Sequence, residues 1–587
     1  MKKELWIVLL IPFLLYAQEQ VEIEVQGKKV PLNFDSKKDV WIIEGKTLTE
    51  LPSLNLADLL RFAANLSFVC RGFFQSDTQG LGFNQEQFTV LVDGVPVNNS
   101  QTGHHNLILP LHTENIKRIE ILRGSFSPVL SSAGPGGVIN IITSRENAVH
   151  FSLSSFQTLK ASINLGSNRL FFSSGLKSTG GYMEGIDGNE YFSRAGIRIP
   201  IKNSILDIQG SWMISKFGAF NFYAPYPSFE NLSKIWGSLY WRMSLTQNAT
   251  LFLKSSTRYS KDIFHLYRES PELYSNTHNT FQNTVETGIT LNKETFSACL
   301  GLSAFLDSIN SSGIRNGESG SALGEHRRSL FSFFGEAGRE TKSLFLNGGI
   351  RFTEGTNSGL SGHVLLGTYL GSSWQTFFSL NRTFRFPTYT ELYYSDPSHL
   401  SNPGLKAEKS WGTNFSLKQQ GDMGDITFRI FFHLTENLID WNWNPGLNMW
   451  NSANIQEGKH TGFEADYSLR KTSFQLNVLY TFQKACFKHD TGLNEMKYHY
   501  YFPEHSLSVL FQKDLSLFSL YWVMKLEKER LKSAPTTALN IKILKPVGHF
   551  FIYLEILNLF NTRMEKIPGL PEAPRSFSIG AKYIFTK

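Results

Sequence analysis

Apolar and polar residues alternate along the chain from about residue 149 to its end. In the last segment Phe577, Ile579 and Ala581 alternate with small or polar residues, and segments 463–470 and 474–482 repeat this pattern. A period of two is that of a β-strand whose two faces meet different surroundings. Charged side chains at alternate positions require that one face of each strand contacts water. The pattern therefore predicts the wall of an all-β transmembrane barrel, with an apolar outer face and a polar lumen.

The length of this region predicts the width of the barrel. About 440 residues, at roughly 20 for each strand with its turn, correspond to on the order of 22 antiparallel strands. A barrel of this width needs a plug in its lumen. A soluble β-propeller is the alternative architecture, but the sequence contains no repeat of blade length.

The region from about residue 20 to 148 has the pattern of a small mixed α/β domain. Residues 55–64 place their apolar side chains on one face of a helix. Residues 88–92 form an apolar, β-rich segment that ends in an Asp-Gly turn, and short buried strands are predicted at 116–122 and 137–143.

The N-terminus predicts secretion. Lys2 and Lys3 precede an apolar stretch at residues 5–15, and a cleavage site is possible after Ala17. The alternative interpretation is a membrane anchor helix, but the stretch is shorter than the roughly 20 residues that span a bilayer.

The composition argues against two other classes of protein, helical membrane proteins and nucleic-acid-binding proteins. Charged residues make up 18% of the chain and aromatic residues 14%, while no apolar run after the first twenty positions is long enough for a membrane-spanning helix. The net charge of +7 comes from scattered Lys and Arg residues. Nucleic acid is therefore not an expected partner.

Three segments of the first domain resemble the plug signature of TonB-dependent outer-membrane receptors. They are residues 90–97, 116–124 and 136–143, in the order and spacing of that family. The barrel segments 380–393 and 402–410 are similar to a barrel motif of the same family. The resemblance implies a plug in the lumen of an outer-membrane barrel, in contact with lipid. It divides the chain into a signal peptide at 1–17, a periplasmic segment at 18–35, a plug at 36–148 and a barrel at 149–587.

The resemblance also implies charges that hold the plug against the wall. Charged groups among apolar residues must form ion pairs or remain in contact with water. In the family, such plug charges meet charges of the barrel. The alternative is ordinary surface charges at alternate strand positions. In one departure from the family pattern, Leu81 stands where an arginine is expected. The candidate plug and barrel charges are Arg118, Glu120, Arg123, Arg385, Glu391 and Glu408.

An apolar-alternating segment near the mature N-terminus is the candidate handle for the energising protein. An extended segment of this kind can add as a strand to the edge of a partner's sheet, although other edge strands share the pattern. The resemblance implies that the partner is the periplasmic domain of TonB. The inner-membrane partner proteins of TonB supply its energy. The candidate residues are Val21, Glu22, Ile23, Glu24 and Val25.

Two segments are candidates for ligand binding. His104 and His105 follow the first plug strand and could touch a metal-bearing ligand or bind a metal directly; hydrogen-bonding histidines in a polar loop are the alternative. Phe222, Tyr223 and Tyr226 lie in an aromatic segment that resembles one in cobalamin-type receptors and could pack on a planar ligand. An interfacial girdle is the alternative there. The resemblance implies a scarce nutrient, with cobalamin first, then ferric siderophores, haem and other metal chelates.

No motif for catalysis or for a resident cofactor is present. The sequence contains no Gly-x-Ser-x-Gly, no His-Glu-x-x-His and no phosphate-binding loop. A nutrient receptor is therefore predicted, rather than an enzyme. A barrel enzyme remains one alternative, and a passive porin or adhesin another; neither needs a plug with a handle.

Overall fold

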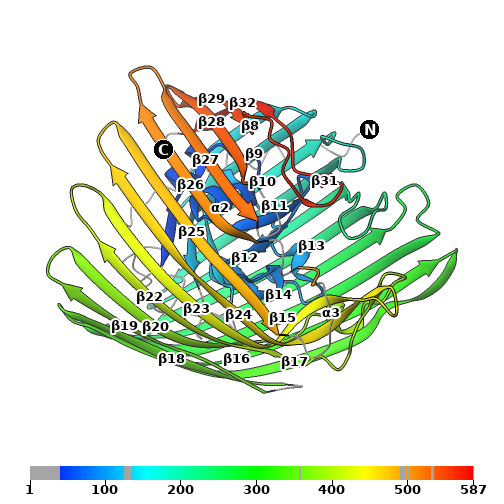
Figure 1. The fold of residues 1–587 in the computed structure, drawn as a ribbon. Coiled ribbons are helices and arrows are strands. Elements are labelled where there is room, and N and C mark those ends of the chain that lie inside the picture. Colours follow the sequence, from blue (N-terminus) through cyan, green and yellow to red (C-terminus); the bar gives the residue numbers. More distant parts are fainter. Residues whose placement is uncertain are drawn as a thin grey trace.

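The computed structural model describes residues 40–123, 134–355, 358–488, 496–498, 502–529 and 534–585. The predicted signal peptide, the segment 18–35 and the candidate handle at 21–25 lie outside the described residues. Figure 1 shows a closed ring of long strands around a small domain made of the first part of the chain. None of the described helices is long and apolar enough to cross a bilayer.

The wall is a closed antiparallel barrel of 22 strands among the described residues, as the alternation predicted. Its seam joins the last strand to the first, with Ile579 opposite Leu153. The wall strands are β8 (Ala148–Ser154), β9 (Thr158–Gly166), β10 (Leu170–Thr179), β11 (Gly188–Ile201), β12 (Ser204–Gly218), β13 (Phe229–Ser244), β14 (Ala249–His265), β15 (Tyr274–Asn292), β16 (Phe296–Arg315), β17 (Glu318–Glu340), β18 (Leu344–Glu354), β19 (Gly359–Leu370), β20 (Trp374–Arg385), β22 (Glu408–Gln419), β23 (Asp425–Asn444), β24 (Met449–Arg470), β25 (Phe474–Lys488), β26 (Pro503–Asp514), β27 (Ser519–Glu529), β28 (Thr536–Val547), β29 (Phe550–Leu557) and β32 (Ser576–Ile584).

The two ends of the barrel differ in their connections. At one end, which we call the turn end, neighbouring strands are joined by short turns such as residues 202–203 and 371–373. At the other, the loop end, longer connections include 219–228, 386–407 and 558–575. The longer connections contain α3 (Tyr389–Tyr393), β21 (His399–Leu400), β30 (Glu565–Ile567) and β31 (Leu570–Pro571).

Alternate wall residues face opposite surroundings. On β17 and β18, Phe331 and Ile350 point outward and are 57% and 55% exposed. Inward positions are polar: Glu464 on β24 and Arg429 on β23 are buried within the lumen and lie opposite each other. An apolar outer surface around a polar lumen is the arrangement of a barrel wall in contact with lipid.

The small domain, which we call the plug, is built on a five-stranded sheet with the order β1-β6-β7-β4-β5. The pair β4 and β7 is parallel, and the other pairs are antiparallel. Its elements are β1 (Trp41–Glu44), α1 (Gly45–Glu50), α2 (Leu56–Ala63), β2 (Ser67–Arg71), β3 (Gln75–Gln79), η3 (Gln85–Gln87), β4 (Phe88–Val92), β5 (Val95–Pro96), η4 (Gly103–His105), η5 (Thr113–Asn115), β6 (Ile116–Leu122) and β7 (Gly137–Thr143).

Local chemistry explains these elements. Asn55 begins α2 because its side chain accepts a hydrogen bond from Asp58 N at 3.0 Å. Asp93 and Gly94 take left-handed φ values of 53° and 78°, which reverse the chain between β4 and β5. The apolar core of the plug continues into the wall through a shared cluster, to which the wall contributes Trp236, Phe431, Leu479, Leu510 and Val523.

Candidate functional site

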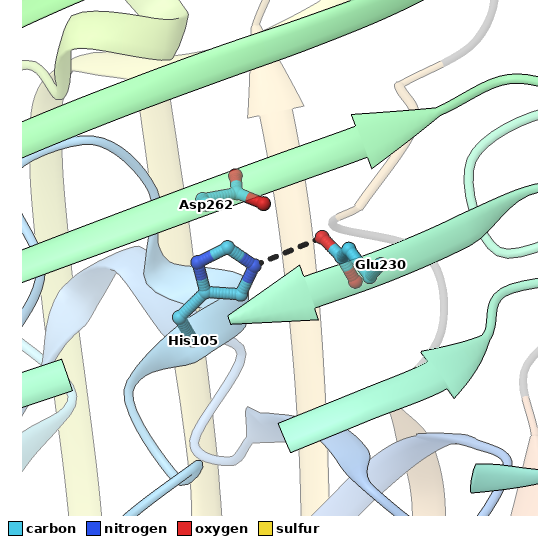
Figure 2. A group of neighbouring side chains, drawn as sticks. All are labelled: His105, Glu230 and Asp262. Carbon is cyan, nitrogen blue, oxygen red and sulfur yellow. Dashed lines mark hydrogen bonds and ion pairs between the residues drawn. The ribbon is translucent and has the colours of Figure 1, made fainter. Parts of the chain in front are cut away.

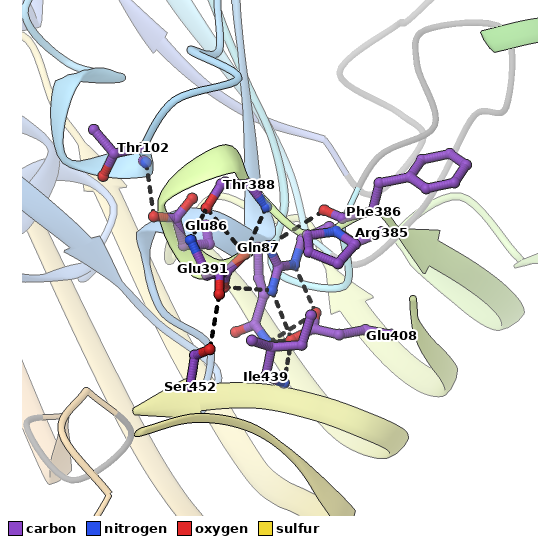
Figure 3. A network of polar contacts seen from close by, with 12 residues as sticks. Glu86, Gln87, Thr102, Arg385, Phe386, Thr388, Glu391, Glu408, Ile439 and Ser452 are labelled. Atoms are coloured by element: carbon purple, nitrogen blue, oxygen red, sulfur yellow. Dashed lines mark hydrogen bonds and ion pairs between the residues drawn. The ribbon is translucent and has the colours of Figure 1, made fainter. Parts of the chain in front are cut away.

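A buried ion-pair network ties the loop end of the wall to the plug. Arg385 lies between two carboxylates: its Nε and Nη2 donate to Glu408 at 2.8 and 2.9 Å, and its Nη1 and Nη2 donate to Glu391 at 3.0 Å each. Figure 3 shows these groups meeting from the ends of β20, α3 and β22. Thr388 caps α3 and donates its backbone N–H to Glu391 at 2.7 Å. Two-fold bonding of both carboxylates fixes the guanidinium plane.

The plug joins this network through η3. Gln87 Nε2 donates to both oxygens of Glu408, at 3.1 and 3.2 Å. The neighbouring Glu86, which Figure 3 labels, accepts a hydrogen bond from Gly103 N at 2.7 Å. In addition, Tyr389 N of α3 donates to Ser100 O of the plug at 2.9 Å. The connection 386–407 and the plug therefore form one hydrogen-bonded unit.

The environment of Glu86 predicts that the stability of the folded chain depends on pH. Burial, reinforced by the nearby carboxylate of Glu391, raises the pKa of Glu86 from 4.5 to about 8. A carboxyl with a raised pKa stabilises the folded state fully below its ordinary pKa, and this contribution is lost as the pH rises through about 8. Glu86→Gln keeps the acceptor for Gly103 N without a charge. We expect this variant to melt several degrees higher than the native chain above pH 8 and nearly equally at pH 4.

The measurement is thermal unfolding of the purified chain in detergent across this pH range. Glu44→Gln is the matched control, because Glu44 is exposed on β1. Equal pH profiles for the native chain and Glu86→Gln would show that Glu86 does not carry this dependence.

The three candidate charges of the plug have different partners. Arg118 and Glu120 pair with each other along β6, with Arg118 Nη2 2.7 Å from Glu120 Oε1. Arg123 instead meets the wall: it forms an ion pair with Glu464 on β24 and donates to Ala64 O at 2.5 Å. The resemblance implied contact with the wall for all three, and the described contacts supply it at Arg123.

Leu81 occupies the position where the family pattern has an arginine. Its side chain is buried in the apolar core of the plug, and its backbone φ is 52°. The next residue, Gly82, has no room for a side chain, because a Cβ there would lie 1.9 Å from His460 Nδ1 of the wall. Apolar packing and close backbone approach thus take the place of an ion pair at this point.

The plug segment 97–111, which we call the apex, carries both candidate histidines. His104 Nδ1 lies 2.8 Å from Asp77 Oδ1, and Arg71 Nε donates to the same carboxylate at 2.8 Å. Burial raises the pKa of Asp77, but its interactions with His104 and Arg71 outweigh this effect and lower the pKa to about 2. His105 lies 3.1 Å from Glu230 Oε1 of the wall. Burial lowers the pKa of His105 to about 4, so its imidazole is neutral at neutral pH.

The aromatic segment lies over this part of the plug. The Tyr223 hydroxyl donates to Gln75 Oε1 at 3.0 Å and reaches Glu230 Oε1 at 3.2 Å, and the Tyr223 ring lies 5.3 Å from that of His104. Phe222 is buried in an apolar cluster behind it. Tyr226 packs against Tyr267 of the next connection instead. Of the three aromatic candidates, Tyr223 thus contacts His104. Phe222 belongs to the apolar cluster behind Tyr223, and Tyr226 contacts neither histidine in the described contacts.

Two acidic wall residues complete this region and were not predicted. Glu230 and Asp262 lie at the loop ends of β13 and β14, and their carboxylate oxygens approach His105 within 4.8 Å. Each is a single acidic residue in a strand, 125 or more positions from His105, so no motif in the sequence marks it. Together with His105 they are groups that could hold a metal ion.

A cavity of about 1110 Å³ lies between the plug and the wall toward the turn end. It is lined by plug residues of β1, α1 and η5 and by wall residues of the first and last strands. Its charged lining includes Lys160, Lys542, Glu114 and Glu555. The cavity lining beside the plug thus carries charged side chains of both signs.

A closed 22-stranded wall with a folded domain in its lumen defines a plugged-barrel receptor. Residues 33–138 match the TonB-dependent receptor plug domain, and residues 155–534 match the TonB-dependent receptor-like β-barrel. The chain belongs to the TonB-dependent receptor family, as the sequence predicted. This is a family of transport receptors.

Individual relatives agree with this family. The vitamin B12 transporter BtuB of Vibrio vulnificus (strain CMCP6) is 34% identical over 108 residues, which are 18% of this chain and 17% of that protein. The copper transporter OprC has a TM-score of 0.80 at 13% identity, covering 94% of this chain and 98% of that one. The siderophore receptor PirA from Acinetobacter baumannii has a TM-score of 0.73 at 16% identity, covering 97% and 100%. At such identities the structural likeness shows the fold alone.

Proposed function

We propose that this chain imports a scarce, large nutrient across the outer membrane of a Gram-negative bacterium and depends on TonB for energy. The observation that carries the proposal is the plug, which lies in the lumen and is held to the wall by buried polar contacts such as those of Gln87 and Arg123. A passive pore needs no such domain. The sequence contains no phosphate-binding loop for an energy-yielding reaction, so in this proposal the energy comes from a partner.

Cobalamin is the first candidate ligand, and ferric siderophores or other metal chelates follow. Support comes from the limited similarity to a vitamin B12 transporter and from the fold shared with a siderophore receptor. In this proposal the loop end faces outward and ligand binds between the apex and the connection 219–228, where His104 and Tyr223 contact each other. Lipid surrounds the apolar face of the wall.

The proposed transport step is a displacement of the plug. TonB pairs with the handle at residues 21–25 and pulls on the plug from the turn end. The plug-to-wall contacts then break, and the cavity beside the plug widens into a path. For ligand to trigger this step, the ligand-bound and free plugs must differ in free energy at the handle.

The test is accumulation of radiolabelled cobalamin by receptor-deficient cells that express this chain, with and without TonB. We expect surface binding in both strains and accumulation only in the strain with TonB. Equal accumulation in the two strains would indicate passive permeation and contradict the proposal. Absence of binding by a folded receptor would exclude cobalamin, and the same pair of strains would then be tested with ferric siderophores.

A further inference from the structure

One imidazole of the plug and two carboxylates of the wall form a buried cluster near the loop end (Figure 2). His105 ends η4, Glu230 is the second residue of β13, and Asp262 lies three residues before the end of β14. One ligand atom of each lies within 4.8 Å of the other two. The three residues are 2%, 2% and 3% exposed, so the cluster is shielded from bulk water.

The fold holds these groups in place from both sides. In the pairing of β13 with β14, Leu232 lies opposite Asp262, so Glu230 is the diagonal neighbour of Asp262 on the same lumen-facing side. Lys234 Nζ donates to the carbonyl oxygens of His105 and Ile108 at 3.0 and 2.8 Å. This lysine anchors the backbone of the apex, so the imidazole is presented to the two carboxylates.

The cluster has unused bonding capacity. Asp262 Oδ1 is buried and has no hydrogen-bond partner among the described residues. Asp262 Oδ2 accepts a hydrogen bond from Gln101 at 2.6 Å. Within the described part of the chain, the ion-pair partner of Glu230 is His105 rather than a lysine or arginine. Buried carboxylates are normally paired with a cation or coordinate a metal ion.

We propose that His105, Glu230 and Asp262 bind one divalent transition-metal ion, represented by Zn²⁺, as cargo of the receptor. This proposal rests on the proposed function and, among its candidate ligands, selects the metal chelates, whose ion these residues bind. One imidazole nitrogen and two carboxylate oxygens suit Zn²⁺ and its first-row neighbours, and three protein ligands leave a position for water or for a donor atom of a chelate. The three atoms lie within 4.8 Å of one another, and a bound ion would draw each of them to the roughly 2.0–2.2 Å that Zn²⁺ requires.

Binding also requires a defined proton position. His105 Nε2, which lies 3.1 Å from Glu230 Oε1, supplies its lone pair to the ion. The ring then keeps a single proton on Nδ1. Both carboxylates bind in their ionised forms, so any proton they share with the imidazole leaves to solvent when the ion enters.

The placement of the ligands on two bodies gives this site a release mechanism. His105 belongs to the plug, while Glu230 and Asp262 belong to the wall. Displacement of the plug therefore removes one of three ligands and weakens the site. By the same linkage, a bound ion favours the seated plug, so force on the plug and affinity for the ion oppose each other.

The test measures binding of Zn²⁺ alone to the purified full chain in detergent, by competition with a chromophoric chelator. We expect one Zn²⁺ per chain. His105→Ala, Glu230→Gln and Asp262→Asn should each weaken binding at least about 100-fold, because loss of even an outer-shell partner costs 10–100-fold. The control is His363→Gln, a buried wall histidine on β19 outside the cluster. Heat-dependent gel mobility verifies that each barrel is folded.

Several results would overturn the metal site. They are no binding of Zn²⁺ by the folded native chain, an unchanged affinity in all three cluster variants, or displacement of Zn²⁺ by equimolar Ca²⁺. The assay needs no TonB, so it separates this inference from the proposed function. Zn²⁺ binding without TonB-dependent accumulation of radioactive zinc would contradict the cargo role. TonB-dependent accumulation of cobalamin without Zn²⁺ binding would overturn only the metal site.

Discussion

Deletion of residues 21–25 is expected to reduce ligand accumulation to the level of TonB-deficient cells, while binding of ligand at the cell surface persists. The physical reason is that an extended segment adds to a partner's sheet through its main-chain hydrogen bonds. Without this segment no force reaches the plug. The ligand-binding groups proposed here lie far along the chain, at the apex and the loop end, so their affinity for ligand should not change.

Two substitutions separate strand pairing from the mere presence of a side chain. Ile23→Pro removes a backbone donor and should have nearly the effect of the deletion. Ile23→Val, the matched control, keeps both the donor and the β-branched side chain and should accumulate ligand normally. The handle assignment fails if the deletion variant still accumulates ligand in a TonB-dependent manner.

Arg385→Met is expected to destabilise the joint between plug and wall by about 3–5 kcal/mol, the usual cost of removing one partner from a buried ion pair. The substitution leaves Glu391 and Glu408 buried without their shared cation, and Glu408 also binds Gln87 of the plug. We expect a lower melting temperature and faster tryptic cleavage of the plug in the purified receptor.

Arg382→Met is the control for loss of a positive charge on the same strand. The Arg382 guanidinium lies over the Trp411 ring, 5.5 Å from its centroid, and the side chain is partly exposed. Loss of the Arg382 side chain should therefore reduce the stability of the receptor much less than Arg385→Met does. Adding Glu391→Gln and Glu408→Gln to Arg385→Met should recover part of the loss, because the buried charges are then absent. Equal stability of Arg385→Met and Arg382→Met would show that the Arg385 network does not stabilise the contact between plug and wall.

The alternating pattern was sufficient to predict the wall because each wall strand meets lipid on one side and the polar lumen on the other. Lumen-facing Glu464 and outward-facing Phe463 are neighbours in sequence and opposite in exposure. The plug strand at 88–92 was also predicted, because it is a mostly apolar, β-rich segment that ends in a turn with left-handed residues.

Contacts between distant strands could not be predicted in the same way. Arg118 and Glu120 stand two positions apart on β6, so they share a face and pair locally. The partner of Arg123 depends on where β24 passes the plug. The approach of Asp262 to Glu230 depends on the register of β13 with β14. Such register is set by the whole barrel and leaves no local trace in the sequence.

The seam between β8 and β32 has a consequence for biogenesis. The last strand of the wall pairs with the first, and residue 154 contacts residue 578. Until the C-terminus has been delivered, β8 and β29 each present an unpaired edge, which is prone to pairing with other chains. The plug is made before any wall strand, and its core is completed by residues of the wall as late as Val523. Assembly must therefore gather the plug before the seam closes, and a chain shortened by its final strand should remain open and be degraded.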